Sequence, residues 1–374
     1  MDKKYDKLFE SYTFNNGVKV KNRLVVAPLT VYDSGPNGEL TDAARRFWHD
    51  RFKGFGMWII PFTNVHPSGI GFESPNAFRD EDIVTLKEYA QISHEQGALG
   101  ILQIAHSGIR ADRSMTQGYD VLAPSDYPYS GARAMTDAEV REMVHSFAHA
   151  AELAIKAGLD GVEIHGANGW LIQQFVSATY NQRTDHWGGS FEKRLNFPME
   201  IIDAIDEVRK KYNRPDFIVG YRFSPEEPGE YGLTMKETLG LVDHLLEKPL
   251  QYIHISLWNF YKKIRRGGDT HETRMEAFHK RINGKIPFIG VGDLFAEEDG
   301  LKAFNTGWAD FLAVGGSVEL NPHLVDMIKN GQEDQIQSKF DWSRMDEYRF
   351  TPAMLYGTLA GNAMFPPSVQ TGLN

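Results

Sequence analysis

The sequence predicts an α/β protein with the (β/α)8 TIM-barrel fold, built as a single domain with a C-terminal extension. Two observations support this prediction. From near the first residue to about residue 330, short apolar runs alternate with longer segments whose apolar residues recur at helical spacing. Eight such runs are present, and eight parallel strands close a barrel.

The eight candidate strands follow one another in regular order. They are residues 24–28 (LVVAP), 57–62 (MWIIPF), 100–104 (GILQI), 161–164 (GVEI), 218–223 (IVGYRF), 252–256 (YIHIS), 287–291 (PFIGV) and 311–315 (FLAVG). These runs are too continuously apolar for a one-sided antiparallel sheet. They suit parallel strands that are covered by helices outside and by packed side chains inside.

The helix between the third and fourth strands has the clearest limits. Thr136 can cap its start, Glu139 completes a Thr-x-x-Glu capping box, and Gly158 ends it. We expect residues 1–340 to form the barrel. The aromatic and Pro-rich residues 341–374 are expected to form an extension that packs on the barrel or on a neighbouring subunit.

A doubly wound sheet is the alternative α/β fold. Such a sheet normally carries a dinucleotide loop, but no Gly-x-Gly-x-x-Gly follows any of the candidate strands. No Gly-x-x-x-x-Gly-Lys-Ser/Thr occurs either, so the barrel is preferred.

Composition excludes several classes of function. The formal net charge is −10 and no basic run is present, which argues against nucleic acid as a partner. The absence of cysteine removes disulfides, thiolate nucleophiles and iron–sulfur clusters, so any redox chemistry requires a cofactor. Without an 18-residue apolar stretch or a signal-peptide core we expect no membrane partner and a cytoplasmic location.

The carboxyl ends of barrel strands face the active-site mouth, and the residues expected there are amides, imidazoles and one guanidinium. They include Gln103, His106, His165, Asn168 and Arg222. No lysine for a Schiff base and no paired carboxylates stand at these ends. Such donors suit an electron-rich heterocycle with carbonyl oxygens and a phosphate tail, which is the shape of flavin mononucleotide (FMN).

Longer motifs strengthen this interpretation. The most specific are residues 161–175 (GVEIHGANGWLIQQF) and 181–194 (NQRTDHWGGSFEKR), supported by residues 22–24 (NRL), Gln103-x-x-His106-x-Gly108 and Arg222-x-Ser224. From Asn22 to about Leu324 the chain resembles the Old Yellow Enzyme family of FMN-dependent ene-reductases and NADH:flavin oxidoreductases. The family fold is an eight-stranded βα barrel.

The resemblance implies an FMN cofactor with NADH or NADPH as a transient hydride donor. The implied cofactor-binding residues are Ala27, Pro28, Leu29, Thr30, Thr63, Gln103, Arg222, Gly292, Gly315 and Gly316. Gln103 would bond the pyrimidine edge of the flavin, and Arg222 would lie where negative charge gathers on reduction.

The resemblance also implies a ping-pong reaction with a small-molecule, electron-poor acceptor such as an α,β-unsaturated carbonyl compound. His165 and Asn168 would be the catalytic pair, donating hydrogen bonds to one carbonyl oxygen of the acceptor. Tyr32 and Trp170 would contact the substrate. A homo-oligomer is possible, and no metal is expected.

Two departures from the family pattern bear on activity. Trp170 stands where the family has a tyrosine that donates a proton, and an indole N–H is not a useful acid. Tyr32 or water must then supply the proton, or alkene reduction is slow. Gly316 stands where an arginine commonly reaches the FMN phosphate, so backbone N–H groups, Ser317 or an arginine from elsewhere must bind it.

Two alternative functions remain open at this point. The first is a flavin-binding barrel with weak or altered reductase activity, suggested by Trp170 and Gly316. The second is a metal-dependent barrel hydrolase that uses four histidines, His66, His106, His165 and His254.

Overall fold

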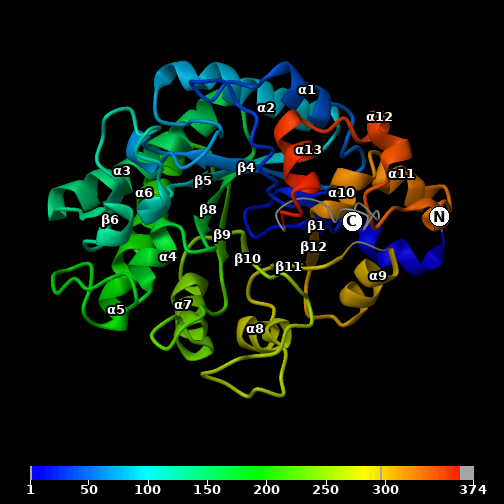
Figure 1. The fold of residues 1–374 in the computed structure, drawn as a ribbon. Helices are drawn as coiled ribbons and strands as arrows, with labels where there is room; N and C mark the ends of the chain where they lie inside the picture. Colours follow the sequence, from blue (N-terminus) through cyan, green and yellow to red (C-terminus); the bar gives the residue numbers. More distant parts are fainter. Residues whose placement is uncertain (1, 295–296, 363–374) are drawn as a thin grey trace.

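The computed structural model describes residues 2–294 and 297–362 and shows a closed barrel of eight parallel strands (Figure 1). In barrel order these strands are β3 (Leu24–Val26), β4 (Met57–Asn64), β5 (Leu99–Ala105), β8 (Gly161–Gly166), β9 (Ile218–Phe223), β10 (Tyr252–Ile255), β11 (Phe288–Val291) and β12 (Phe311–Val314). β12 pairs with β3 and closes the ring. All eight predicted strands are confirmed, and no end differs from the prediction by more than two residues.

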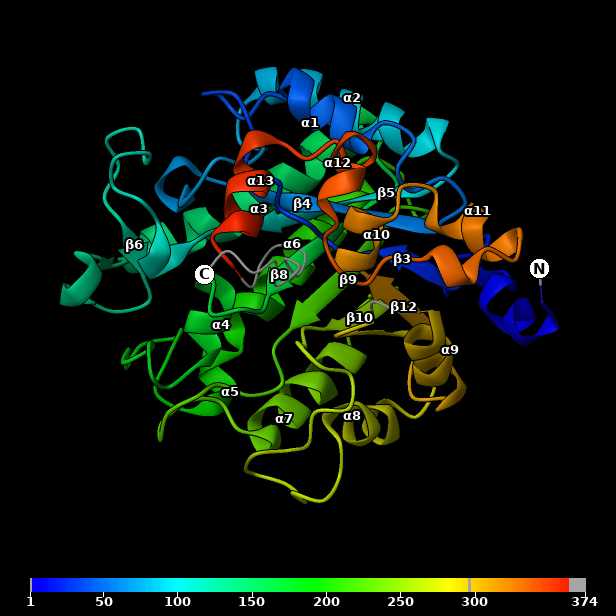
Figure 2. The same cartoon turned by 45° about the vertical axis from the view of Figure 1, so that its right-hand side comes forward.

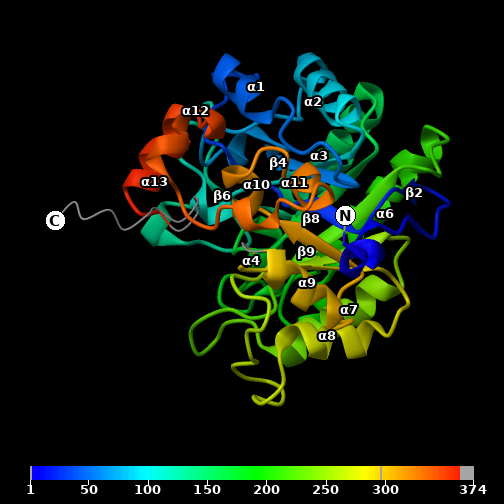
Figure 3. The ribbon, with the colours of Figure 1, turned by 90° about the vertical axis from the view of Figure 1, so that its right-hand side faces the viewer.

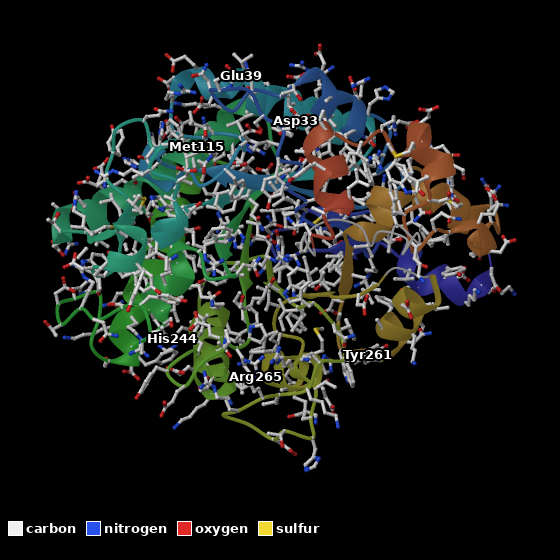
Figure 4. The ribbon with its side chains drawn as sticks, viewed as in Figure 1. Asp33, Glu39, Met115, His244, Tyr261 and Arg265 are labelled. Atoms are coloured by element: carbon white, nitrogen blue, oxygen red, sulfur yellow. The ribbon has the colours of Figure 1, made fainter. Side chains whose placement is uncertain are left out.

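Strand residues alternate between the inside of the barrel and the helices around it. In β4, Met57 and Ile59 belong to the interior cluster, whereas Trp58 and Ile60 belong to the cluster packed against the helices, and all four are fully buried. This double burial explains why the strands are continuously apolar in sequence. Interior side chains such as Met57, Ile59 and Ile289 are fully buried against one another, so the barrel is a packed core and not a channel. Figure 4 shows the side chains on the ribbon.

Helices surround the strands, as Figure 2 shows. The helices of the barrel layer and its loops are α1 (Asp42–Trp48), α2 (Ile83–Glu95), α3 (Asp137–Ala157), α4 (Leu171–Val176), α5 (Phe191–Arg194), α6 (Asn196–Lys211), α7 (Met235–Leu246), α8 (Arg274–Ile282), α9 (Glu297–Asn305), α10 (Gly316–Leu320) and α11 (Leu324–Lys329). The predicted limits of α3 are confirmed: Thr136 and Glu139 form the capping box, and Gly158 ends the helix with φ +83°.

A short hairpin that the sequence analysis did not predict closes the N-terminal end of the barrel. It consists of β1 (Tyr12–Thr13) and β2 (Lys19–Val20). Phe14, between the two strands, stacks on Phe311 inside the barrel with ring centroids 5.7 Å apart. Another small sheet, β6 (Leu122–Ala123) with β7 (Arg133–Ala134), stands in the loop that follows β5. Both pairs are too short to show an alternating pattern in the sequence.

The segment after residue 340 packs on the barrel between α1 and α10 (Figure 3). It contains α12 (Met345–Tyr348) and α13 (Pro352–Leu359). The buried ring of Tyr348 stacks on Phe350 and packs in a tilted arrangement against Phe340, and the Thr351 hydroxyl donates to the carbonyl of Val31 at 3.0 Å. The division at residue 340 and a contact with a neighbouring subunit stay predictions, and residues 363–374 lie outside the described part of the chain.

Candidate active site at the barrel mouth

Inward-facing side chains form two polar rows near the carboxyl ends of β5, β8, β9 and β10. The upper row, nearer the mouth, is formed by His165, Arg222 and His254, which are register partners on adjacent strands. The lower row, one inward position deeper, is formed by Gln103, Glu163, Gly220 and Tyr252. The side chains of both rows are buried. Polar groups this deep are stable only if they bind one another or a ligand.

Glu163 is the centre of the lower row. Its carboxylate accepts hydrogen bonds from Gln103 at 2.7 Å, from the Tyr252 hydroxyl at 3.1 Å and from His254 Nδ1 at 2.8 Å. Burial alone would raise the pKa of Glu163, but His254, Gln103 and the charge of Arg222 hold it below the ordinary value. Glu163 is therefore ionised and compensates the buried guanidinium. The sequence analysis did not identify this role, because a strand glutamate has no distinguishing pattern.

Two atoms of the upper row have no hydrogen-bond partner within the described residues. They are Nε of Arg222 and Nε2 of His254, and both are buried. A buried donor or acceptor without a partner costs about 1–3 kcal/mol. The upper row is therefore incomplete without a ligand that accepts a hydrogen bond from a guanidinium, which the carbonyl and ring-nitrogen edge of a flavin can do.

His165 is a neutral hydrogen-bond donor. Burial, with the positive charge of Arg222 next, lowers its pKa well below the ordinary histidine value. Its Nδ1 accepts from the backbone N–H of Ala167 at 3.3 Å, so the single ring proton is on Nε2. This nitrogen is the one that can donate to a substrate oxygen.

Asn168 lies three residues further on, in a left-handed turn with φ +58°. Its side chain is exposed at the mouth. Two glutamines of α4 hold the next residue of this turn: Gln173 accepts from the N–H of Gly169 at 2.9 Å, and Gln174 donates to its carbonyl at 2.8 Å. The turn explains how His165 and Asn168 both reach the mouth although they are three positions apart.

An aromatic wall, formed by Tyr32, Phe62, Phe72 and Trp170, stands beside His165. Trp170 lies with its ring centroid 5.2 Å from Phe62, 5.9 Å from Phe72 and 6.5 Å from the His165 ring. Tyr32 contacts Phe72 at 5.2 Å, so it is separated from Trp170 by one ring. The structure thus brings the two residues predicted to bind substrate into one surface. Phe62 and Phe72 were missed because they resemble ordinary core residues in the sequence.

The remaining predicted cofactor residues lie in the neighbouring sector of the mouth. Ala27, Pro28, Leu29 and Thr30 follow β3, Thr63 is in β4, Gly292 follows β11, and Gly315 and Gly316 follow β12. Their four strands are adjacent in the barrel. Gly292 has φ +128°, and a Cβ there would lie 2.8 Å from the backbone nitrogen of Phe260, so this position requires glycine. A Cβ on Gly315 would meet the end of the Leu29 side chain at 2.9 Å. Predicted residues from β5, β8 and β9 extend the set to seven of the eight strand ends, and β10 contributes none.

The four histidines of the hydrolase alternative do not form one set. His66 and His106 share the hydroxyl of Ser68, at 2.8 and 2.9 Å, whereas His165 and His254 flank Arg222 inside the barrel. Within residues 2–294 and 297–362 no group of three or more histidine, aspartate or glutamate side chains is placed to hold a metal ion. None of the helices in these residues is both long enough and apolar enough to span a membrane.

A cavity of about 540 Å³ lies away from this site. It is lined by Phe9, Lys21, Asn22, Gly54 and Lys329, near the N-terminal ends of β3 and β4. None of the predicted site residues lines it. Because chemistry in parallel barrels resides at the carboxyl ends of the strands, the polar rows and not this cavity mark the candidate active site.

Comparisons with known proteins identify relatives of this chain. Residues 7–335 match the sequence pattern of the NADH:flavin oxidoreductase / NADH oxidase family. The chain is 43% identical to a probable NADH-dependent flavin oxidoreductase of Bacillus subtilis, over 93% of this chain and 94% of that protein. It is 33% identical to an NADH:acrylate oxidoreductase of Vibrio harveyi and 32% identical to an NADH:fumarate oxidoreductase of Klebsiella pneumoniae, over 87% and 97% of this chain. It spans only 33% and 41% of those two longer proteins.

Solved structures show the same fold. Morphinone reductase superposes with a TM-score of 0.71 at 26% identity, covering 87% of this chain and 89% of that one. An Old Yellow Enzyme homologue from Zymomonas mobilis superposes with a TM-score of 0.73 at 23% identity, covering 87% of this chain and 93% of that one.

Proposed function

The chain belongs to the NADH:flavin oxidoreductase / NADH oxidase family and is an FMN-dependent oxidoreductase, and from this premise we propose that it passes hydride from NADH to an α,β-unsaturated carbonyl compound held by His165 and Asn168. The observation that carries the proposal is the pair of outward donors, Nε2–H of His165 and the amide of Asn168, beside the incomplete upper row.

The residues at the mouth fit FMN. The bound flavin supplies the chemistry that this chain lacks, because it accepts hydride from NADH and gives it to a second substrate. Arg222 is the fixed positive charge that favours the reduced, anionic ring, and Gln103 keeps a free acceptor oxygen because its amide nitrogen donates to Glu163. Backbone N–H groups near Gly292, Gly315 and Gly316 would hold the phosphate, with Ser317 or an arginine from elsewhere as the alternatives.

The clamp formed by His165 and Asn168 activates the acceptor. Two hydrogen bonds to the carbonyl oxygen stabilise the negative charge that develops there when hydride reaches the β-carbon. Since burial keeps His165 neutral, it stabilises this charge as a hydrogen-bond donor and does not transfer its proton. Reduction of the alkene is complete only when the α-carbon also receives a proton.

Trp170 decides how that proton arrives. Its indole occupies the aromatic wall against Phe62 and His165, at the sequence position where the family has the tyrosine that donates a proton. Tyr32 lies one ring further away, and burial raises its pKa above the ordinary value. Water therefore supplies the proton, and protonation is slow. The same observation favours the second candidate function, a flavin barrel whose reductase activity is weak or altered.

Several finer points stay predictions. NADH is preferred over NADPH because the Bacillus relative is described as NADH-dependent, although a Geobacillus relative, 34% identical, is described as an NADPH dehydrogenase. The acceptor is a small molecule. The cytoplasmic location, the absence of nucleic acid and membrane partners and a homo-oligomeric state are expectations from the sequence.

The first experiment follows flavin absorbance. The purified protein should be yellow, bleach with NADH in the absence of oxygen and regain its colour when cyclohex-2-enone is added. A protein that stays colourless after incubation with FMN contradicts the proposal.

Site variants then test the clamp. His165→Ala combined with Asn168→Ala should retain FMN and NADH bleaching but lose reoxidation by the enone, by about a hundredfold or more. The matched control changes His145, exposed on α3, and Asn305, exposed at the end of α9, to alanine and should behave as wild type. Unchanged enone reoxidation in the clamp variant removes the assignment of the two residues.

A further inference from the structure

The environment of Asn168 is fixed at three of its four polar groups. Its backbone N–H donates to the Ser224 hydroxyl at 2.8 Å, and its backbone carbonyl accepts from Arg110 at 3.0 Å. Its side-chain oxygen accepts from the Ser256 hydroxyl at 2.7 Å. In the described part of the chain, the amide NH2 group is the polar group of this residue that no protein atom binds.

Ser256 is itself held rigidly. It directly follows β10, and its backbone N–H donates to the carbonyl of Phe223 in β9 at 2.8 Å, which continues the hydrogen-bond ladder of the barrel. The hydroxyl is therefore presented to Asn168 from a strand end and not from a mobile loop. Residues on rigid elements hold catalytic groups more accurately than residues on loops.

A carboxamide can be turned by 180° about its last side-chain bond with almost no change of shape, so only hydrogen bonds decide which end faces a ligand. With the present orientation, the Ser256 proton has an acceptor in the Asn168 oxygen. In the reversed orientation the hydroxyl would accept from the NH2 group, and its own proton would lose the acceptor that it has now. Ser224 and Arg110 bind only the backbone of Asn168 and do not distinguish the two orientations.

We propose that Ser256 is a positioning residue that, by holding the oxygen of Asn168, directs its NH2 group at the substrate. The inference rests on the proposed function of the clamp and extends it to the class of ligand that the clamp prefers. With both His165 and Asn168 presented as donors, the site selects ligands whose oxygen only accepts hydrogen bonds, such as ketones, aldehydes and esters. It discriminates against ligands that must donate, because a donor facing a donor leaves both groups without a partner.

The test measures ligand preference and not turnover. Dissociation constants are obtained from the change of flavin absorbance on titration with cyclohex-2-enone, which only accepts, and with 4-chlorophenol kept neutral at pH 6, which can donate. In Ser256→Ala the enone constant should rise about tenfold, while the phenol constant stays the same or falls. Ser256→Thr keeps a hydroxyl and should restore the wild-type ratio. Ser146→Ala on α3, whose hydroxyl donates to the carbonyl of Glu142 on the same helix, is the matched control.

A double variant separates positioning from a general structural effect. In an Asn168→Ala background there is no amide to orient, so Ser256→Ala should change neither constant further. An enone-to-phenol ratio that Ser256→Ala leaves unaltered, or an equal loss of enone affinity in the Asn168→Ala background, overturns the inference. FMN binding and bleaching by NADH should be normal in the wild type, in Ser256→Ala, in Ser256→Thr and in Ser146→Ala. Failure of these in the wild type would count against the proposed function instead.

Discussion

Replacing Gly220 by alanine tests the packing beneath the upper row. Gly220 lies in β9 between Glu163 and Tyr252 in the lower row. Because it has no Cβ, the ring of Tyr252 can pass over it, and the Tyr252 hydroxyl reaches Glu163. A methyl group at this position would occupy the space of the ring.

The size of the effect follows from the distances. A Cβ on Gly220 would lie 2.1, 2.3 and 2.6 Å from three atoms of the Tyr252 ring. Ordinary contact begins at 3.4 Å, so the ring must move by 3.4 − 2.1 = 1.3 Å. The hydrogen bond to Glu163, now 3.1 Å long, would be lost. Overpacking costs about 1–3 kcal/mol and the bond to a carboxylate about 1.5–3 kcal/mol, so we expect Gly220→Ala to lower the free energy of unfolding by about 3–5 kcal/mol.

Urea denaturation followed by tryptophan fluorescence measures this change. Tyr252→Phe removes only the hydroxyl and should account for about half of the loss. Gly300→Ala, in the middle of α9 with nothing within 4 Å of the added Cβ, is the control and should be neutral or stabilising. If the free energy of unfolding of Gly220→Ala lies within about 1 kcal/mol of the wild-type value, the reasoning is refuted, because the Tyr252 ring then accommodates the added methyl group without the expected cost.

Three further predictions concern the site itself. Trp170→Tyr should raise the rate of flavin reoxidation by cyclohex-2-enone at least about tenfold, because a phenol can donate the missing proton. The rate is measured by stopped flow, and an unchanged rate means that proton delivery does not limit the reaction. Arg222→Gln should lower the midpoint potential of bound FMN by roughly 50 mV in a dye-linked titration, since a fixed positive charge is removed; a constant or higher potential argues against contact with the reduced ring. Burial holds the pKa values of His106, His165 and His254 below the ordinary value, so the unfolded chain binds protons that the folded chain excludes. The free energy of unfolding should therefore fall as pH drops below about 6.5, by up to about 1.4 kcal/mol per pH unit for each histidine. Urea titrations at pH 7.5 and 5.5 with equal midpoints would contradict this.

Much of the fold was predictable because it depends on local pattern. Eight apolar runs of strand length, separated by helical segments, are determined by the burial of each strand on both faces. The capping box of α3 is read from Thr136 and Glu139 alone. The hairpin of β1 and β2 was missed because two-residue strands leave no periodicity to detect.

The site was predictable where a residue stands at the end of a strand. His165, Asn168 and Arg222 were assigned to the mouth from their distance to apolar runs, and register places His165 and Arg222 side by side. Phe72 was not assigned, because it stands in the loop after β4 and reaches Trp170 only in the folded chain.

The sequence by itself determined the eight-stranded barrel, its order of strands and several of the polar residues at the mouth, such as His165, Asn168 and Arg222, but not Glu163 or Ser256. Only the tertiary structure decided their partners: Glu163 meets His254 across 91 positions of sequence, and Ser256 meets Asn168 across 88. The physical reason is that such pairs are set by strand register and by closure of the ring, which bring distant residues within hydrogen-bond distance. A single sequence carries the side chains but not the distances between them.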